Sequence, residues 1–377
     1  MRMTANRSTL LDKGAGKSKP LYLQIRQKLA DSILADELRP GQRLPNVTKL
    51  VREWNVHPRT IKSALDLLEQ DGLIRQEPRR GAFVAGVEQV TQTSMLFVRW
   101  SGDPLCVRIA EGVQQFAHEV DVEVMVVDAR QDHRSFTDAI AHPPEGTAGL
   151  LIMPFDSPAY RQAVRSSLDA GLKVVFVDRV LPGIETSAVT ADHFAAGYRV
   201  TRHLIETHQR PVHYVGSTQI PSSCHERCRG WAAAMQEHNF GELERFAWEL
   251  PVPEFESCQL PFEDIFDNPR RAALRMFAEA RPAVTCVHAS NDYVGKGVYL
   301  AAEQSGLRIG RDVFVGGSGG LPICQMLEPP LTSVYQDGVR LGYEAARLLH
   351  QELTGAVRRP MHRVLPVELQ VRQSSTG

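Results

Sequence analysis

The sequence lacks any long apolar run. No stretch of about 18 consecutive apolar residues occurs, so no membrane-spanning helix is expected. Residues 1–19 are polar and charged and lack the apolar core of a signal peptide, so we expect a disordered lead-in there and no secretion. The six cysteines are scattered, which favours reduced cytoplasmic thiols over a disulfide framework. Cys224 and Cys228 flank His225, but two further ligands at metal-site spacing are missing, so we expect no metal and no other cofactor.

The net charge of −1 conceals an uneven distribution along the chain. Residues 1–86 carry 16 Lys and Arg against 9 Asp and Glu, whereas residues 87–377 carry the other 27 against 35. A basic segment attracts phosphates because binding releases their condensed counter-ions, so we expect the first part to bind a polyanion. A chain of 377 residues is also too long for one ordinary core, which predicts at least two domains.

The basic part has the pattern of a small helical domain that ends in a hairpin. Apolar residues at helical spacing predict helices over about 20–36, 46–54 and 58–70, with Asn46 as the N-cap of the second. Two short apolar segments, 73–76 and 82–84, follow and predict a β-hairpin. This order predicts a winged helix-turn-helix domain over residues 20–86.

The third helix carries polar residues at its N-terminal end, away from its apolar face. A recognition helix reads base edges in the major groove with such residues, so we expect Arg59, Thr60 and Lys62 to contact DNA. Arg59 can form two hydrogen bonds to one guanine. Arg79 and Arg80, at the tip of the hairpin, can reach a phosphate or the minor groove. The alternative is that these arginines only form a solvated surface.

Five segments of this part resemble the GntR-type winged-helix DNA-binding domain. They are 20–25 (PLYLQI), 39–45 (RPGQRLP), 56–65 (VHPRTIKSAL), 69–73 (EQDGL) and 81–84 (GAFV). The resemblance implies DNA contacts at Asn46, Arg59, Thr60, Lys62 and Gly81. Thr48 stands where the family usually has a DNA-contacting arginine, and the adjacent Lys49 offers a replacement cation.

From residue 95 onward, short apolar runs alternate with helical patterns. The expected strands are 95–98, 122–127, 149–153, 173–177, 212–215, 283–287 and 312–315, and the expected helices are 105–118, 160–168, 194–206, 226–237, 270–280 and 294–305. Such alternation predicts an α/β fold with doubly wound parallel sheets. The length of this part predicts two lobes with a cleft between them, and ligands of such folds bind beyond the carboxyl ends of the strands.

Polar residues that follow these strands are the candidates for ligand contacts. They are Trp100, Ser101, Asp103, Asp156, Asp178, Arg179, Asn291, Asp292 and Ser318. Each could instead cap a helix, but their shared placement favours a polar pocket. Arg227, in the helix after the strand 212–215, could also face the cleft and clamp vicinal hydroxyls or a carboxylate.

This second part resembles the effector domain of the LacI family, which is related to periplasmic sugar-binding proteins. The resemblance rests on 177–179 (VDR), 189–197 (VTADHFAAG), 203–204 (HL), 226–231 (ERCRGW), 290–292 (SND) with 295, 306–310 (GLRIG), and 330–337 (PLTSVYQD) with 342. It implies effector contacts at Asp103, Asp178, Arg227, Asn291 and Gln336. Ser318 replaces the family's acidic sugar ligand, His193 replaces its usual asparagine, and Trp100 could stack on a sugar ring.

These features are typical of a cytoplasmic transcriptional regulator, a repressor, that binds double-stranded operator DNA as a homodimer. We expect residues 20–86 to bind DNA, 87–94 to form a linker, and 95–372 to bind a carbohydrate-like effector and to dimerise. No catalytic set can be placed from spacing, so we expect no enzyme and no membrane association. The alternatives are a cytoplasmic solute-binding protein or an α/β cleft enzyme without a DNA role.

Overall fold

The computed structural model describes residues 20–34, 38, 42–70, 73–77, 80–84, 94–99, 103–128, 133–219, 221–251, 264–280 and 285–377. The predicted lead-in, residues 87–93 of the predicted linker, Arg79 and Trp100 lie outside these ranges. The chain divides into two compact units, Met1–Gln92 and Thr93–Gly377, which are described separately. Within the described residues, no helix is long and apolar enough to cross a membrane.

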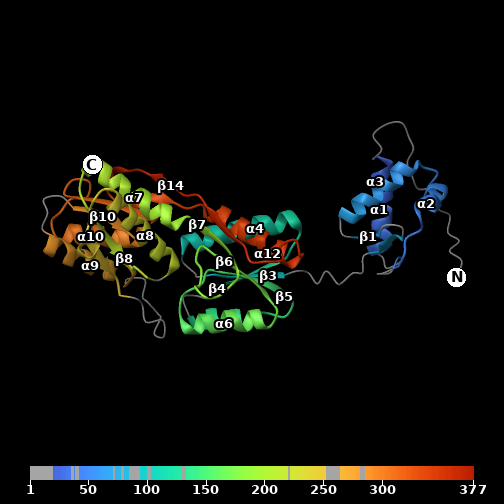
Figure 1. Cartoon of the computed structure of the whole chain (residues 1–377), viewed down its shortest axis with the longest axis horizontal. Helices are drawn as coiled ribbons and strands as arrows, with labels where there is room; N and C mark the ends of the chain where they lie inside the picture. Colours follow the sequence, from blue (N-terminus) through green and yellow to red (C-terminus); the bar gives the residue numbers. More distant parts are fainter. Residues whose placement is uncertain are drawn as a thin grey trace. The chain divides into compact units, whose positions relative to one another are not determined.

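The first unit confirms the predicted winged helix-turn-helix (Figure 1). Its elements are α1 (Leu21–Leu34), α2 (Val47–Trp54), α3 (Pro58–Gln70), β1 (Ile74–Glu77) and β2 (Gly81–Val84). The two strands pair antiparallel to form the wing. Ile25 of α1, Leu50 of α2, and Ile61 and Leu68 of α3 are buried together, so the apolar face of each helix meets in one small core.

The second unit contains two six-stranded sheets, each the centre of one lobe. Lobe one has the order β13-β7-β6-β5-β3-β4, and lobe two has the order β14-β12-β11-β10-β8-β9. The strands of lobe one are β3 (Ser94–Arg99), β4 (Val124–Asp128), β5 (Thr147–Ile152), β6 (Lys173–Val177), β7 (Ser187–Ala191) and β13 (His362–Leu365). Those of lobe two are β8 (Val212–Gly216), β9 (Ala247–Glu249), β10 (Thr285–Ala289), β11 (Val313–Gly319), β12 (Thr332–Tyr335) and β14 (Glu368–Gln370). Among these strands β14 alone pairs antiparallel, which confirms the predicted parallel sheets.

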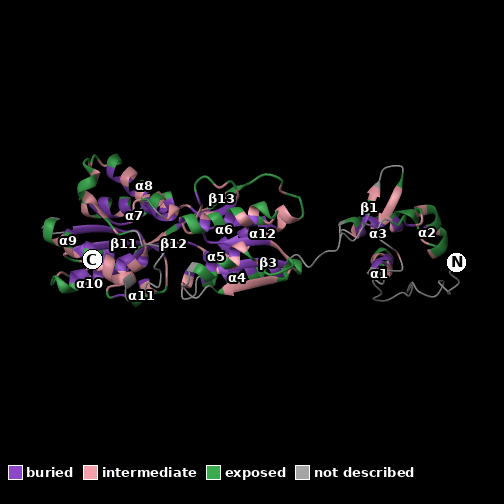
Figure 2. Ribbon diagram, turned by 90° about the horizontal axis from the view of Figure 1, so that it is seen from below, coloured by how far each residue is buried: buried purple, intermediate pink, exposed green. Residues whose placement is uncertain are grey.

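Helices cover both faces of each sheet. Lobe one has α4 (Pro104–Val120) and α12 (Gly338–Leu353) on one face and α6 (Pro158–Asp169) on the other (Figure 1). The helix α5 (His133–Ala141) packs beside α6 on that second face. In lobe two, α7 (His193–His208) and α8 (Ser222–Glu237) face α9 (Asp264–Ala280) and α10 (Asp292–Gln304) across the sheet. Three short helices complete lobe two: η1 (Leu243–Phe246), α11 (Ile323–Met326) and α13 (Gln373–Thr376). The inner strands of each sheet are therefore buried on both sides (Figure 2), whereas the edge strands β4, β9, β13 and β14 are partly exposed.

The chain passes between the lobes three times. It leaves lobe one between β7 and α7, returns between β12 and α12, and leaves again between β13 and β14. These crossings bring residues 191–193, 335–338 and 365–368 to the boundary between the lobes. A group placed there can contact both lobes at once, and this is where the candidate site lies.

Several elements differ from the sequence-based expectation. The strands β7, β9, β12, β13 and β14, the helices α5 and α12, and the short helices η1, α11 and α13 were not predicted. Residues 283–284 of the predicted strand 283–287 lie outside the described ranges, and this strand (β10) continues to Ala289; the predicted strand 312–315 (β11) continues to Gly319. Ser318 therefore lies inside β11, and the expectation that it follows the strand is wrong. The neighbours of this extension leave no room for larger residues: a Cβ on Gly316 would lie 2.8 Å from Val200, and one on Gly317 would lie 2.6 Å from Asp292.

Two glycines let α4 and α12 pack backbone against backbone. A Cβ on Gly112 would lie 1.8 Å from the carbonyl oxygen of Val339, and one on Gly342 would lie 1.9 Å from that of Ile109.

We expect Gly342→Ala to destabilise the second unit by roughly 1–3 kcal/mol, because backbone atoms cannot move aside as a side chain can. Urea unfolding of Gly342→Ala beside Gly241→Ala measures this, since a Cβ on Gly241 has nothing within 4 Å. Equal stability of the two variants would contradict the packing argument.

Candidate functional site

The exposed side of α3 carries the residues predicted to read DNA. Arg59 and Lys62 are exposed and Thr60 is half-buried, whereas Ile61, Ala64 and Leu65 on the opposite side are buried. The backbone N–H of Arg59 donates to Nδ1 of His57 at 3.2 Å, so His57 satisfies a free donor at the start of the helix. The local sequence thus fixes the start of α3 and leaves the Arg59 side chain exposed.

The predicted contacts on α2 and the wing have different local roles. The Asn46 side chain accepts a hydrogen bond from the Lys49 N–H at 2.9 Å, which confirms that Asn46 caps α2. Thr48 and Lys49 are exposed on the first turn of α2, and Arg80 is exposed beside the Phe83 ring, 5.7 Å from its centroid. Arg79 lies outside the described residues.

Gly81 begins β2 with a φ of +105°, a conformation that side chains with a Cβ rarely adopt. A Cβ there would lie 3.2 Å from Nε and Nη2 of Arg43. The structure thus places Arg43, for which the sequence predicted no role, against the base of the wing. Arg43 forms an isolated antiparallel β-bridge with Phe83. Because this bridge pairs segments that are distant in sequence, the position of Arg43 could not be predicted from residue spacing.

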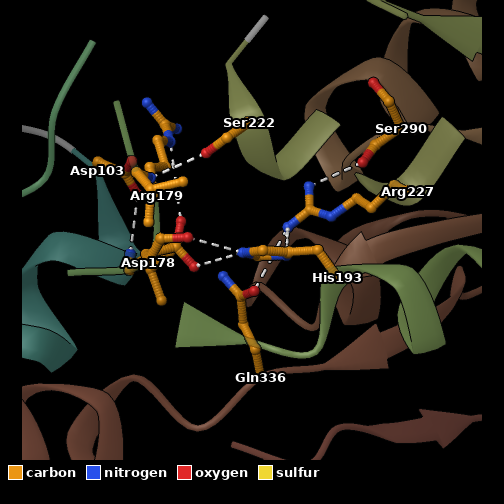
Figure 3. Close-up of polar contacts among 10 residues, drawn as sticks. Asp103, Asp178, Arg179, His193, Ser222, Arg227, Ser290 and Gln336 are labelled. Carbon is orange, nitrogen blue, oxygen red and sulfur yellow. Dashed lines mark hydrogen bonds and ion pairs between the residues drawn. The ribbon is translucent and has the colours of Figure 1, made fainter. Parts of the chain in front are cut away.

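At the boundary between the lobes, five polar side chains form a contact network that we call the interlobe cluster: Asp178, Arg179, His193, Arg227 and Gln336 (Figure 3). Asp178 and Arg179 follow β6 in lobe one, and Arg227 lies on α8 in lobe two. His193 and Gln336 lie on the first and second crossings. Four of these five residues were predicted; His193 was not.

His193 connects the acid of lobe one with the cation of lobe two. Its Nε2 lies 2.8 Å from the backbone oxygen of Asp178 and 3.2 Å from Oδ1 of the same residue. Because a carbonyl oxygen can only accept, the proton is assigned to Nε2. Nδ1 is then free to accept a hydrogen bond from Nη2 of Arg227 at 3.2 Å. The only signal in the sequence was that histidine replaces the asparagine usual in the resembled family.

Arg227 is held from lobe two and from the first and second crossings. Its Nη1 donates to the backbone oxygen of Ser290 at 2.9 Å, and its Nη2 reaches Oε1 of Gln336 at 3.4 Å as well as His193. Its side chain is only 5% exposed. A Cβ on Gly197 of α7 would lie 2.0 Å from the Arg227 carbonyl oxygen, so this glycine allows α8 to carry Arg227 close to the crossing.

Asp178 is a buried, ionised carboxylate. Burial alone would raise its pKa, but contact with His193 and the proximity of Arg179 and Arg227 outweigh burial and lower the pKa to about 2. Nε of Arg179 lies 3.8 Å from Oδ2 of Asp178, and its guanidinium lies 4.8 Å from the centroid of the Phe155 ring. A second link joins the lobes here, because Ser222 Oγ accepts from the Val180 N–H at 2.9 Å.

The other predicted effector residues lie in different settings. Asp103 caps α4 by accepting from the Leu105 N–H at 2.9 Å, and burial raises its pKa. Asn291 caps α10 by accepting from the Val294 N–H at 2.9 Å. Ser318 is 1% exposed in β11, where it pairs with Val334 of β12. Trp100 lies outside the described residues.

Several buried polar atoms of this region have no hydrogen-bond partner among the described residues. They are Nε of Arg227, Nε and Nη1 of Arg179, Oδ1 of Asp178, Oγ of Ser318 and Nε2 of His288. Oδ1 of Asp178 is within ion-pair distance of His193, but the geometry is not that of a hydrogen bond. Buried polar groups are nearly always satisfied in native proteins. A ligand with several hydroxyls or charged oxygens could supply these partners.

His288, beside this cluster, gives a pH-dependent contribution to stability. It is fully buried, Thr201 Oγ1 lies 3.1 Å from its Nδ1, and burial together with the charge of Arg227 lowers its pKa to about 3.

In the unfolded chain the pKa of a histidine is about 6.5. Between the pKa values of the folded and unfolded states the unfolded state binds more protons, so the stability that His288 contributes falls as pH falls. We expect the wild type to lose more unfolding free energy between pH 7 and 5 than His288→Gln does. Urea titrations at these pH values, with the exposed His118→Gln as control, test this; parallel profiles for all three proteins would contradict it.

Comparison with known proteins identifies the parts of the chain. Residues 21–84 match the model of bacterial regulatory proteins of the gntR family, and residues 201–375 match that of a periplasmic binding protein-like domain. The transcriptional regulator CelR of Thermobifida fusca is 29% identical over 208 residues, which are 55% of this chain and 57% of CelR. The arabinose metabolism transcriptional repressor of Geobacillus stearothermophilus is 22% identical over 89% of this chain and 92% of its own length.

Solved structures show the same fold. A complex of the regulator CelR with cellobiose has a TM-score of 0.64 and 23% identity, and covers 87% of this chain and 95% of its own. A LacI family regulator from Enterococcus faecium with bound ribose has a TM-score of 0.60 and 19% identity, and covers 75% of this chain and 98% of its own. The chain therefore joins a GntR-type winged-helix domain to a periplasmic-binding-protein-like domain with the fold of LacI family regulators.

Proposed function

We propose that the protein is a transcriptional repressor that binds operator DNA and changes its operator affinity when a small carbohydrate-like effector binds at the interlobe cluster. The observation that carries the proposal is the presence of both halves of such a device in one chain. The GntR-type domain exposes Arg59 and Lys62 on its recognition helix, and the second unit holds buried polar atoms without partners where its lobes meet. The relatives CelR and the arabinose repressor, named as regulators of transcription, support it.

The cluster offers a physical route from ligand to lobe movement. Among the described residues, Arg227 of lobe two is linked to Asp178 of lobe one through His193 on the first crossing. An effector that hydrogen-bonds both Asp178 and Arg227 would replace this relay and favour another angle between the lobes. A ligand shifts such an equilibrium only through contacts that differ between its two states. In this proposal residues 85–94 pass the change to the DNA-binding domain.

The proposed partner contacts are those predicted from the sequence. Asp178, Arg179, Arg227 and Gln336, joined now by His193, would bind the effector directly. Asp103, Asn291 and Ser318 remain proposed contacts, as does Trp100, which lies outside the described residues. Two-fold operators are bound by two-fold proteins, so we propose a homodimer that acts on DNA in the bacterial cytoplasm. One winged domain alone makes a small interface for tight specific binding, which also favours a dimer.

The function is tested by selecting bound duplexes from a random DNA library with the full-length protein. We expect a palindromic consensus, a dimer in sedimentation, and a change in affinity when the ligand that most raises the melting temperature is added. The ligand panel comprises pentoses, hexoses, sugar acids and purines. Enrichment of no sequence, or an operator affinity that no stabilising ligand alters, would refute the proposal.

A further inference from the structure

Arg227 is a buried cation whose hydrogen-bond partners are all uncharged. They are the Ser290 carbonyl oxygen, Nδ1 of His193 and Oε1 of Gln336, and Nε has no partner in the described part of the chain. No described carboxylate lies within 4.0 Å of its guanidinium. Because Arg227 is only 5% exposed, water can compensate little of its charge. Buried charges in proteins are normally paired, so Arg227 is short of one negative charge.

The acids that surround Arg227 are committed to other groups. Asp178 contacts His193 and Arg179. Asp292 is fully buried, but it accepts hydrogen bonds from Ser333 Oγ at 2.6 Å and from the Leu321 N–H at 2.8 Å, and burial raises its pKa. Neither carboxylate can turn toward Arg227 without leaving another buried donor unsatisfied.

The unpartnered atoms of the interlobe region are mostly donors. Nε of Arg227 and Nε and Nη1 of Arg179 can only donate, and the Ser318 hydroxyl can do so as well. The acceptors among these atoms are one oxygen of Asp178 and, in one tautomer, His288 Nε2. Each hydroxyl of a neutral polyol brings a donor together with uncharged acceptors, whereas a carboxylate or phosphate brings charged acceptors. The excess of cationic donors therefore fits an anion better.

We propose that the effector carries a negatively charged group, a carboxylate or a phosphate, which pairs with Arg227. The inference rests on the proposed function, because it assigns the chemistry of the ligand at the same site. Its ligand class is a sugar acid or a sugar phosphate rather than a neutral sugar. The hydroxyls of the same molecule bind Asp178 and Gln336, and its anionic end binds the guanidinium.

Matched ligand pairs test the charge directly. The melting temperature of the full-length protein is measured with glucose, glucuronate and glucose 6-phosphate, with galactose and galacturonate, and with inorganic phosphate, all at one ionic strength. We expect an anionic member of a set to bind roughly tenfold more tightly than its neutral counterpart, the difference between a charged and a neutral hydrogen bond. Glucuronate and glucose 6-phosphate distinguish a carboxylate from a phosphate as the recognised group.

Variants assign the effect to Arg227. Arg227→Gln keeps a donor but removes the charge, and we expect it to lose the stabilisation by anions, inorganic phosphate included. Arg229→Gln is the matched control, because Arg229 lies on the same helix, is exposed, and pairs with Glu226 at 2.9 Å. The melting temperature of each unliganded variant shows whether it folds.

The outcomes separate this inference from the proposed function. Anions that stabilise the wild type and Arg229→Gln but not Arg227→Gln support the inference. Equal shifts in wild type and Arg227→Gln, no stabilisation by any anion, or tighter binding of the neutral sugar would each overturn it. If a neutral sugar changes operator affinity, the inference fails while the regulator proposal stands. If anions bind through Arg227 but the protein selects no DNA sequence, only the regulator proposal fails.

Discussion

Arg227→Ala should abolish the effector response while operator affinity without effector stays nearly unchanged. The guanidinium contacts lobe two through Ser290, and it contacts the first and second crossings through His193 and Gln336, so its loss removes the contacts that join lobe two to these crossings. Coupling between sites is lost when a ligand no longer distinguishes the two states. Fluorescence anisotropy of labelled operator, titrated with and without effector, measures both quantities. For the variant we expect the same operator-binding curve with and without effector, whereas the wild type should give two different curves.

A purely structural role for Arg227 gives the opposite pattern. Arg227→Ala would then lower the melting temperature and leave effector-induced release of DNA intact. Calorimetry with effector, run beside a melting curve on the same preparation, separates the two cases. Arg229→Ala, two residues along α8 with an exposed side chain, controls for the loss of an arginine from this helix.

Arg59→Ala should weaken operator binding by roughly 1–3 kcal/mol and relax specificity at one base pair, since one bidentate contact to guanine has about this value. The side chain is exposed on the first turn of α3, where a recognition helix reads bases. Competition of the operator against single-base variants measures the relaxation. An unchanged base preference in the variant would refute the assignment of Arg59 to base recognition.

Arg80→Ala provides the comparison for Arg59. Arg80 is exposed on the wing, and a phosphate contact there carries no sequence information. We expect a similar loss on every duplex and a slope of log affinity against log salt that is smaller by about 1. The difference between the two variants therefore lies in specificity and salt dependence, not in the size of the loss.

The winged domain was predictable because its signals are local. Helical periodicity, the Asn46 cap and the short hairpin segments each involve neighbours in sequence, and the structure contains α1–α3, β1 and β2 close to the expected bounds. Arg43 was missed because its contact with Gly81 arises only when the segment before α2 pairs with the wing.

The second unit was predictable where strands are apolar on both faces and missed where they are not. Met95 and Phe97 face α4 and α12, whereas Leu96 and Val98 face α5 and α6, so β3 reads as a continuous apolar run. β7 and β13 contain Ser, Thr, His and Arg and lack that signal. Because β7 was missed, nothing marked His193 as a residue at a strand end.

The most direct test of the account is whether DNA and effector alter each other's affinity by the same factor. The affinity for the most stabilising ligand of the panel is measured by titration calorimetry with and without saturating operator. Operator affinity is measured with and without that ligand, at the same salt concentration. Linkage requires the two ratios to be equal. We expect an equal ratio, of roughly 5- to 150-fold, in the wild type and a ratio of one in Arg227→Ala. A ligand affinity in the wild type that saturating operator leaves unchanged would contradict the account.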